Sequence, residues 1–318
     1  MKLHHGKLLD PRADLVFKKI FGQHPDLVKS FLNSLLPLPE DGMIETITYL
    51  PFEQIPRTPL QKFSVVDVRC TDQKGRIFIV EMQMGWSDSF KQRLQFGVSK
   101  AYVSQLDSGQ HYNLLNPVYG LALVGDTFDP DPDNWYHHYK MINIMGTHEH
   151  IDGLELIFVE LPKFKITTPW GRRLGVLWLR FLNEISSMGN IPEEFSDVSE
   201  ISKAIQLTQE ASFSKEELAA YDGYWDQIRI DKTIREDARR EGLKEGEAIG
   251  LEKGREEGRE EGEAIGLQRG REEGREEGEA IGVWKEKLHM ARKMKDKNMS
   301  DEDIINFTGL SLQQLKEI

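Results

Sequence analysis

Residues 62–84 read KFSVVDVRCTDQKGRIFIVEMQM, and this stretch decides the fold. Its first half is rich in β-branched residues, which favour strands, and its second half holds the apolar run at 77–80. Between them, Asp72 to Arg76 include Gly75, which suits the left-handed position of a three-residue hairpin loop. The sequence therefore predicts two antiparallel strands joined by a tight turn.

The turn fixes which residues of the two strands lie opposite each other. Counting outward from an Asp72–Arg76 pair gives Thr71 opposite Ile77, Cys70 opposite Phe78, Asp67 opposite Glu81, and Val65 opposite Gln83. Side chains alternate between the two faces of a strand. Asp67, Glu81 and Gln83 are therefore expected on one face, with Val65, Ile77 and Ile79 as their neighbours.

Two opposed carboxylates need a physical reason. Directly opposed residues have Cβ atoms roughly 4.5–5.5 Å apart, and opposed like charges destabilise a sheet. A hard divalent cation provides one reason, because Mg²⁺ is held by one or two carboxylates together with water and substrate phosphate. The alternative is that one acid is solvated or paired with Arg69, and the residue pattern alone leaves both readings open.

Asp67, the glycine turn and Glu81-Met82-Gln83 together resemble the PD-(D/E)XK nuclease core. More narrowly, they are similar to the bacterial Rpn branch, the recombination-promoting nucleases of transposase type. That branch has Glu-x-Gln where the wider superfamily has Asp/Glu-x-Lys. Two further segments match its pattern in the right order, DLVFKKIFG at 14–22 and FVELPKF at 158–164. The resemblance covers residues 8–235 and the style of the tail.

The resemblance implies an α/β fold, in which helices flank a central mixed sheet. It also implies a Mg²⁺-dependent DNA endonuclease, with Mn²⁺ as an alternative ion. Such an enzyme cleaves phosphodiester bonds and promotes recombination or transposition-like exchange of DNA. On this reading Asp67 and Glu81 bind the metal, and Gln83 positions the attacking water.

Glutamine at position 83 is a departure from the superfamily lysine. A lysine there positions water and offsets charge in the transition state, whereas glutamine forms hydrogen bonds without charge. Either Gln83 only orients water, or a cation from the following helix compensates, with Arg93 the first candidate and Lys91 the second; both equally suit a helix surface. The resemblance makes Asp14 a candidate accessory acid, although Asp14 and Lys18 have the spacing of an ordinary i,i+4 ion pair.

The competing class is a non-catalytic interaction module on a nuclease fold, either DNA-associated or self-associating. The glutamine at position 83, the acidic charge and a self-associating tail favour it. A net charge of −12 argues against indiscriminate nucleic-acid binding, which depends on Lys and Arg neutralising phosphates, but it leaves room for a local basic groove. Residues 235–282 hold 16 acids and 10 bases, so half of the excess lies in the tail.

Composition also bounds the compartment. The single cysteine, Cys70, cannot form an internal disulfide and fits a reducing cytoplasm. The chain has no run of 18 apolar residues, and its first residues lack the apolar segment of a signal peptide. These features predict a cytoplasmic protein without a membrane span.

Hydrophobic periodicity and breaker residues place the other elements around the hairpin. Helices are predicted at 12–22, from Pro25 to before Pro37, from Ser87 or Asp88 to Leu106, at 169–188 and within 199–240. Strands are predicted at 43–50, 117–124, 135–142 and 154–161. The helix after the hairpin should bury one stripe, formed by Phe90, Leu94, Val98 and Ala101.

The chain is expected to divide into a nuclease-like domain at 1–235, a charged repeat at 236–283, and a small segment of helix–turn–helix type at 284–318. Residues 247–262 read EAIGLEKGREEGREEG and are repeated with two changes at 263–278, and glycine recurs every four residues from 242 to 282. Eleven glycines at about 1 kcal/mol each disfavour an isolated helix.

Charge spacing in the repeat does little to offset this cost. Residues four apart carry like charges, as Arg255 and Arg259 do, so that only pairs three apart are expected to help. Two interpretations remain open. The repeat is either a flexible spacer or a long helix that is stabilised when copies of the chain associate through the glycine stripe into a homo-oligomer.

Overall fold

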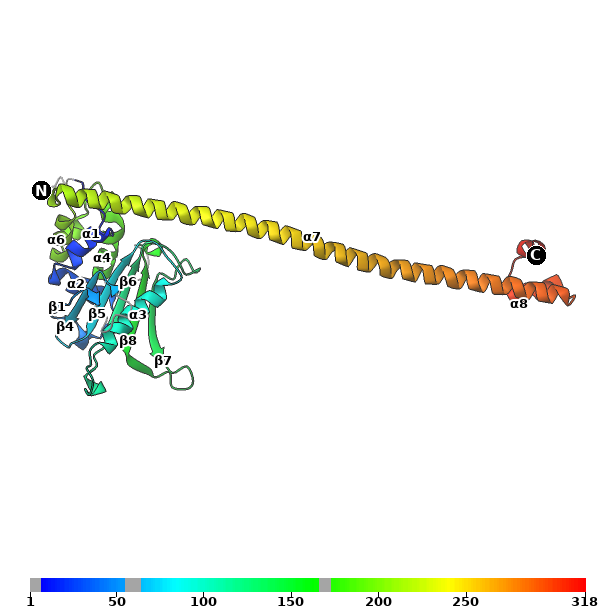
Figure 1. The fold of residues 1–318 in the computed structure, drawn as a ribbon, viewed down its shortest axis with the longest axis horizontal. Helices are drawn as coiled ribbons and strands as arrows, with labels where there is room; N and C mark the ends of the chain where they lie inside the picture. The colour runs from blue at the N-terminus through cyan, green and yellow to red at the C-terminus, as the bar shows by residue number, and fades with distance from the viewer. Residues whose placement is uncertain (1–6, 55–63, 166–172) are drawn as a thin grey trace. The chain divides into compact units, whose positions relative to one another are not determined.

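The computed structural model describes residues 7–54, 64–165 and 173–318, and the chain divides into two compact units, Met1–Ile234 and Arg235–Ile318. The first unit is built on a six-stranded mixed sheet in the order β1-β4-β5-β6-β8-β7 (Figure 1). Its strands are β1 (Ile47–Tyr49), β4 (Val68–Asp72), β5 (Ile77–Gln83), β6 (Val118–Val124), β7 (Tyr136–Ile142) and β8 (His150–Glu160). The expected α/β core with a central mixed sheet is confirmed.

The centre of the sheet is parallel and its edges are antiparallel. β5, β6 and β8 run in the same direction, and every residue of β6 is buried, as expected for a parallel strand covered on both faces. The register pairs Gln83 with Val124 and Val124 with Glu160. Gln83 and Glu160 therefore lie in one row across the sheet, at the carboxyl ends of the parallel strands.

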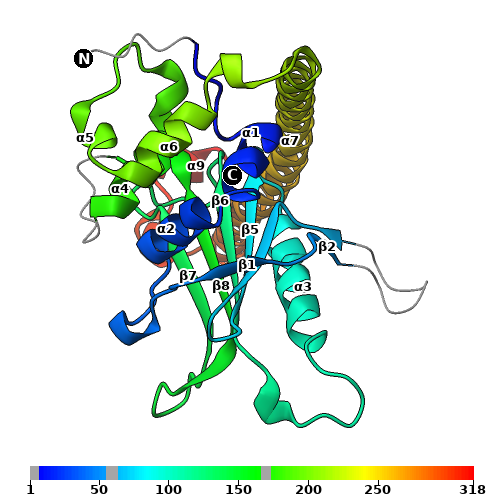
Figure 2. The same ribbon diagram turned by 90° about the vertical axis from the view of Figure 1, so that its left-hand side faces the viewer.

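Helices cover both faces of the sheet. α3 (Phe90–Val103) lies on one face, where the predicted stripe of Phe90, Leu94, Val98 and Ala101 is fully buried (Figure 2). On the opposite face, a separate cluster of buried side chains joins the sheet to five helices. These are α1 (Asp14–Phe21), α2 (Pro25–Leu35), α4 (Arg173–Glu184), α5 (Glu193–Ser196) and α6 (Ser199–Leu207). Residues 169–172 of the predicted fourth helix lie outside the described residues.

The β4–β5 hairpin has the expected turn and register. Thr71 pairs with Ile77 and Cys70 with Phe78, and Gly75 takes the left-handed conformation at φ 75°. The Asp72 carboxylate accepts hydrogen bonds from the backbone N–H of Lys74 and of Arg76, which closes the turn. The side chains of β5 alternate as expected, because Ile77 and Ile79 pack against α3 whereas Phe78 and Val80 face the other core cluster.

The predicted strand at the start of the hairpin is interrupted, which corrects the expected Val65–Gln83 pair. Val65 belongs to a separate two-stranded sheet of β2 (Glu53–Gln54) and β3 (Ser64–Val65), where it pairs with Glu53. The backbone bends at Asp67, and Val66 is buried on the α3 side although Val68 faces the opposite side. Residues 62 and 63 lie outside the described part of the chain.

The beginning of the described chain is joined to the end of α6. Leu8 forms an antiparallel bridge with Gln209, and the Leu9 N–H donates to the Thr208 carbonyl at 2.8 Å. The Glu210 N–H donates in turn to the Lys7 carbonyl at 2.9 Å. These bonds bring the first described residues and residues 208–210 side by side.

The glycine repeat belongs to one helix, α7 (Lys215–Asp296), which is 82 residues long. After it come α8 (Asp301–Thr308) and α9 (Leu312–Lys316), which pack on the end of α7 through Ala291, Ile304, Leu310 and Leu315. Gly309 ends α8 in the left-handed conformation, and Ser311 begins α9 with a capping box. Of the two interpretations of the repeat, the structure shows the long helix.

Ion pairs within the repeat correct the expectation that residues four apart carry only like charges. Arg269 and Glu273 lie 2.9 Å apart, and Arg275 and Glu279 lie 3.6 Å apart, in each case four residues along α7. Such exposed pairs contribute only a few tenths of a kcal/mol each, so the glycine cost remains largely uncompensated.

Within the described ranges, none of the helices has the length and apolar character needed to cross a membrane.

Candidate active site

Asp67 lies where the hairpin strand breaks, one residue before Val68, which forms the last pair of the ladder with Val80. Its Oδ2 accepts a hydrogen bond from the Met82 N–H at 2.7 Å, so that a side chain replaces the carbonyl of a strand partner. Burial raises the pKa of Asp67, while the Met82 N–H and the Lys18 ammonium oppose the rise. The break thus brings a largely desolvated carboxylate beside the β5 backbone.

Glu81 lies on β5, directly before Met82, and only 8% of this residue is exposed. Burial raises the pKa of Glu81 to about 7; Arg93 opposes the rise and the charge of Asp67 adds to it. Arg93 Nη2 lies 3.6 Å from Glu81 Oε2. The charge of Asp67 thus reaches Glu81, although the strand ladder ends at Val68–Val80 and the expected Asp67–Glu81 pair is not part of it.

Gln83 ends β5 and has a partner on each side of its amide. Its Nε2 donates to the Gly85 carbonyl at 2.9 Å, and its Oε1 accepts a hydrogen bond from Arg93 Nη2. Arg93 comes from the first turn of α3, and its guanidinium lies 4.7 Å from the centre of the Phe90 ring. The structure therefore joins Arg93, the first candidate cation, to both Gln83 and Glu81.

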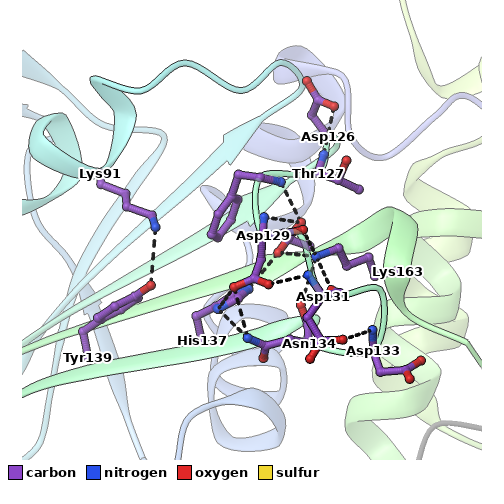
Figure 3. A network of polar contacts seen from close by, with 12 residues as sticks. Lys91, Asp126, Thr127, Asp129, Asp131, Asp133, Asn134, His137, Tyr139 and Lys163 are labelled. Carbon is purple, nitrogen blue, oxygen red and sulfur yellow. Dashed lines mark hydrogen bonds and ion pairs between the residues drawn. The ribbon is translucent and has the colours of Figure 1, made fainter. Parts of the chain in front are cut away.

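Lys91, the second candidate cation, lies elsewhere. Its Nζ is 4.5 Å from the centre of the Phe128 ring and 3.4 Å from the Tyr139 hydroxyl. Figure 3 shows its contact with Tyr139. Because Lys91 also faces the Trp86 ring, this lysine lies over an aromatic cluster. Two residues of the first turn of α3 thus provide different cations, Arg93 at the carboxylates and Lys91 on aromatic rings.

The α1 residues lie on the other side of Asp67. Asp14 and Lys18 form the expected i,i+4 ion pair at 2.7 Å, and Lys18 Nζ is also 3.7 Å from Asp67 Oδ1. The Asp14 charge contributes to the raised pKa of Asp67, although its own side chain is 48% exposed. Sequence reasoning paired Lys18 with Asp14 but missed its position beside Asp67.

The donor set suits a hard divalent cation. Asp67 and Glu81 present carboxylate oxygens, which are preferred ligands of Mg²⁺ and Mn²⁺. Among the residues that the structure describes, no group of three or more His, Cys, Asp or Glu side chains is arranged to hold a metal ion. Two carboxylates with open positions fit an ion that keeps water and substrate oxygens, and they do not fit a structural zinc site.

The family comparison covers the whole of this arrangement. A family model described as PD-(D/E)XK nuclease family transposase matches residues 11–233, from just before α1 into α7. The chain belongs to this family. No curated protein and no solved structure gives a significant match. The match confirms the resemblance drawn from the hairpin and indicates a nuclease- or transposase-type function.

A second polar cluster of this family member received no role from the sequence. The FVELPKF segment contains Glu160, which is fully buried and contacts His137 and Lys163. Glu160 and Lys163 are only three residues apart, but His137 is 23 residues away in sequence. The spacing of a glutamate and a lysine was visible in the sequence, whereas the histidine contact arises from the pairing of β7 with β8.

The raised pKa of Glu81 predicts a pH-dependent stability in the metal-free PD-(D/E)XK protein. Between pH 4.5 and about 7 the unfolded chain releases the Glu81 proton but the folded chain retains it, so the free energy of unfolding should fall as pH rises. The loss should be on the order of 3 kcal/mol and should level off above pH 7. Urea unfolding of wild type and Glu81→Gln in EDTA measures it.

The variant isolates this carboxyl from all other titrating groups. Glu81→Gln resembles the protonated acid, so it should match the wild type below pH 4.5 and exceed its stability at pH 8. A difference between the two proteins that stays constant from pH 5 to pH 8 would show that Glu81 titrates normally.

Proposed function

We propose that this protein is a divalent-metal-dependent DNA endonuclease that promotes recombination or transposition-like exchange. The observation that supports this most directly is the pair of desolvated carboxylates, Asp67 and Glu81, within a nuclease-family domain. Burial raises both pKa values, so a bound cation would favour the ionised carboxylates. Perturbed acids that converge in this way are characteristic of functional sites.

Asp67 and Glu81 would hold Mg²⁺ or Mn²⁺. When bound, such an ion lowers the pKa of coordinated water and offsets charge on the phosphate. Lys18 and Arg93 lie beside the two acids and have partly exposed side chains, so both are placed to contact DNA phosphates. Binding at such a local site is compatible with the net charge of −12.

Gln83 would orient the attacking water. An amide oxygen has two lone pairs, and Arg93 uses one of them in the structure. The other can accept a hydrogen bond from water, which fixes the direction of attack. In this arrangement Arg93 supplies the positive charge that a lysine at position 83 provides in the wider superfamily, and its hydrogen bond to Gln83 joins the two groups.

If Gln83 orients water and Arg93 supplies the charge, the positive charge can be moved between positions 83 and 93. Arg93→Gln should lower kcat by about a hundredfold, the scale for removing one donor that stabilises the transition state. The double variant Gln83→Lys/Arg93→Gln should have a kcat at least about tenfold above that of Arg93→Gln. The new lysine places a cation at position 83, the hydrogen-bond partner of residue 93. Gln83→Ala should slow cleavage and leave metal affinity intact. Single-turnover cleavage rates and Mn²⁺ titrations measure these effects.

A double variant that is no faster than Arg93→Gln would contradict this arrangement. Lys91→Gln is the matched control, because it removes a cation of the same helix that lies on aromatic rings. Its chemical step should stay within about twofold of the wild type.

A metal-titrated nuclease assay on the full chain tests the function itself. Supercoiled plasmid should be nicked or linearised with Mg²⁺ or Mn²⁺, and EDTA should stop the reaction. If purified protein binds DNA or its own copies but never cleaves, the competing interaction-module function is the correct one.

We further propose that the tail associates with other copies of the chain. On α7 the side chains of Ile249, Leu251, Ile265 and Leu267 are each 60% to 67% exposed. The repeat glycines have open space where a side chain would be, so another helix can approach the backbone closely. Burial of these surfaces would offset the glycine cost of the long helix.

A further inference from the structure

The loop that follows β6, residues 125–135, lies between the end of β5 that carries Gln83 and the buried Glu160, to which the proposed chemistry gives no role. It begins directly after Val124, whose neighbours across the sheet are Gln83 on β5 and Glu160 on β8. Strands are spaced about 4.8 Å apart, so Glu160 lies roughly 10 Å from Gln83 in the same row. Glu160 is fully buried, and a buried carboxylate requires specific partners.

Glu160 holds the loop through both of its oxygens. Its Oε2 accepts the Phe128 N–H at 2.8 Å, while its Oε1 accepts His137 Nε2 at 2.7 Å and Lys163 Nζ at 3.0 Å. A backbone amide, a ring nitrogen and an ammonium therefore converge on one carboxylate. The negative charge is compensated by Lys163, whose side chain is itself 8% exposed.

Lys163 occupies the inside of the same loop. Its ammonium donates to the backbone carbonyls of Asp129 and Asp131 at 2.7 and 2.8 Å, and it lies 3.3 Å from that of Asn134 (Figure 3). These oxygens surround the ammonium much as they would a metal cation. The aspartate-rich loop is thus organised by a lysine of its own chain.

The other end of the loop is bonded to the strand end of the candidate site. The Gly125 N–H donates to the Gln83 carbonyl at 2.9 Å, and Asp126 Oδ2 accepts the Trp86 N–H at 3.1 Å. The Phe128 ring stacks on the Trp86 ring, with centroids 4.0 Å apart. Three contacts therefore fix residues 83–86 against a loop that Glu160 anchors.

Trp86 borders the two groups proposed to act on water. The carbonyl of its neighbour Gly85 accepts the Gln83 amide, and its ring contacts Phe90, the first residue of α3, edge to face. Arg93 lies over that same Phe90 ring. A shift of Trp86 would therefore move the acceptor of Gln83 and the support of Arg93 together.

We infer that Glu160 is a positioning residue, which acts through the 125–135 loop and Trp86 to hold Gln83 and Arg93 in the geometry needed for attack on the phosphodiester. The functional half of this inference rests on the proposed endonuclease activity. It gives the FVELPKF segment a role at a distance from the reacting atoms. Glu160 itself touches neither metal nor substrate in this scheme.

A second buried glutamate on β8 provides a matched control. Glu155 accepts from His138 Nε2 at 2.6 Å and from Lys140 Nζ at 3.0 Å, so it also pairs with a histidine and a lysine. Its partners lie on β7, and none of these bonds reaches the 125–135 loop. Glu155→Gln therefore removes a similar buried charge without releasing Trp86.

The experiment compares Glu160→Gln, Glu155→Gln and the wild-type full chain. Hydrogen exchange at the Trp86 and Phe128 amides should accelerate at least about tenfold in Glu160→Gln and remain unchanged in Glu155→Gln. In the cleavage assay Glu160→Gln should lower kcat at least about tenfold with an unchanged Kd for DNA, and Glu155→Gln should keep the wild-type kcat. Equal kcat losses in both variants, or an unchanged Trp86 amide in Glu160→Gln, overturn the inference.

A milder variant covers the case in which Glu160→Gln fails to fold. Asp126→Ala removes the acceptor of the Trp86 N–H, together with that of the Thr127 N–H, from a partly exposed position and leaves Glu160 in place. It should reproduce the faster Trp86 exchange and the selective loss of kcat. Unchanged kcat in that variant overturns the inference. The exchange measurement does not depend on cleavage. If the wild type never cleaves DNA, the proposed endonuclease activity is rejected. The exchange rates of the Trp86 and Phe128 amides then still decide whether Glu160 anchors the loop.

Discussion

Replacing Asp67 with alanine should abolish DNA cleavage and weaken Mg²⁺ or Mn²⁺ binding by at least about a hundredfold. Even partners outside the direct ligand set change metal affinity by 10–100-fold, and a carboxylate ligand should matter more. The expected loss follows from the position of Asp67, which is bonded to the β5 backbone at Met82, lies within electrostatic reach of Glu81 and is largely removed from solvent. Isothermal titration and plasmid nicking measure the two effects.

Asp67 also closes the broken strand, so its two roles must be separated. Asp67→Asn keeps an oxygen that can accept the Met82 N–H but loses the charge, so it should fold like the wild type and still fail to bind metal. Asp88→Asn removes an exposed acid in the turn before α3 and should change neither property. Undiminished nicking by Asp67→Ala would refute the assignment of this residue to the metal site.

Deleting residues 236–318 should leave a folded nuclease domain with intact metal binding and should lower the number of chains per particle. The first compact unit ends at Ile234 and contains its own core, so the deletion removes no buried part of it. The full chain has eleven glycines in the helical repeat, which disfavour an isolated helix by roughly 10 kcal/mol relative to alanine. Light scattering on both proteins measures the masses.

The geometry of the repeat explains how copies would have to meet. Four residues of a helix turn through about 400°, so each glycine lies about 40° past the previous one. The stripe winds round the helix, and a partner must coil with it. An equal number of chains per particle for the full and shortened proteins would reject the tail as an association element.

The hairpin shows how far local pattern reaches in this chain. β-branched residues, a glycine at the turn and strict alternation were enough to predict the Cys70–Phe78 pair and the shared face of Glu81 and Ile79. The Val65 pairing was wrong because the Asp67 side chain takes the Met82 N–H and ends the ladder there. A bond between a side chain and a distant backbone leaves no trace in a two-residue period.

The site was predicted in part for the same reason. Arg93 was identified because it follows the hairpin on the next helix, and the structure joins it to Gln83. Lys18 was not, because its approach to Asp67 depends on how α1 packs beside the sheet. The anchoring of the 125–135 loop by Glu160 likewise depends on the order of three parallel strands, which no single segment encodes.

The pairing of residues 7–9 with residues 208–210 has a consequence for protein engineering. The first described residues lie beside the segment between α6 and α7, held by backbone bonds such as Leu9 N–H to the Thr208 carbonyl. Domains with adjacent ends tolerate insertion into other proteins and circular permutation. A shortened domain that ends early in α7, where the Tyr221 hydroxyl accepts the Asp10 N–H, would therefore have neighbouring ends and should tolerate insertion into a surface loop of a host protein.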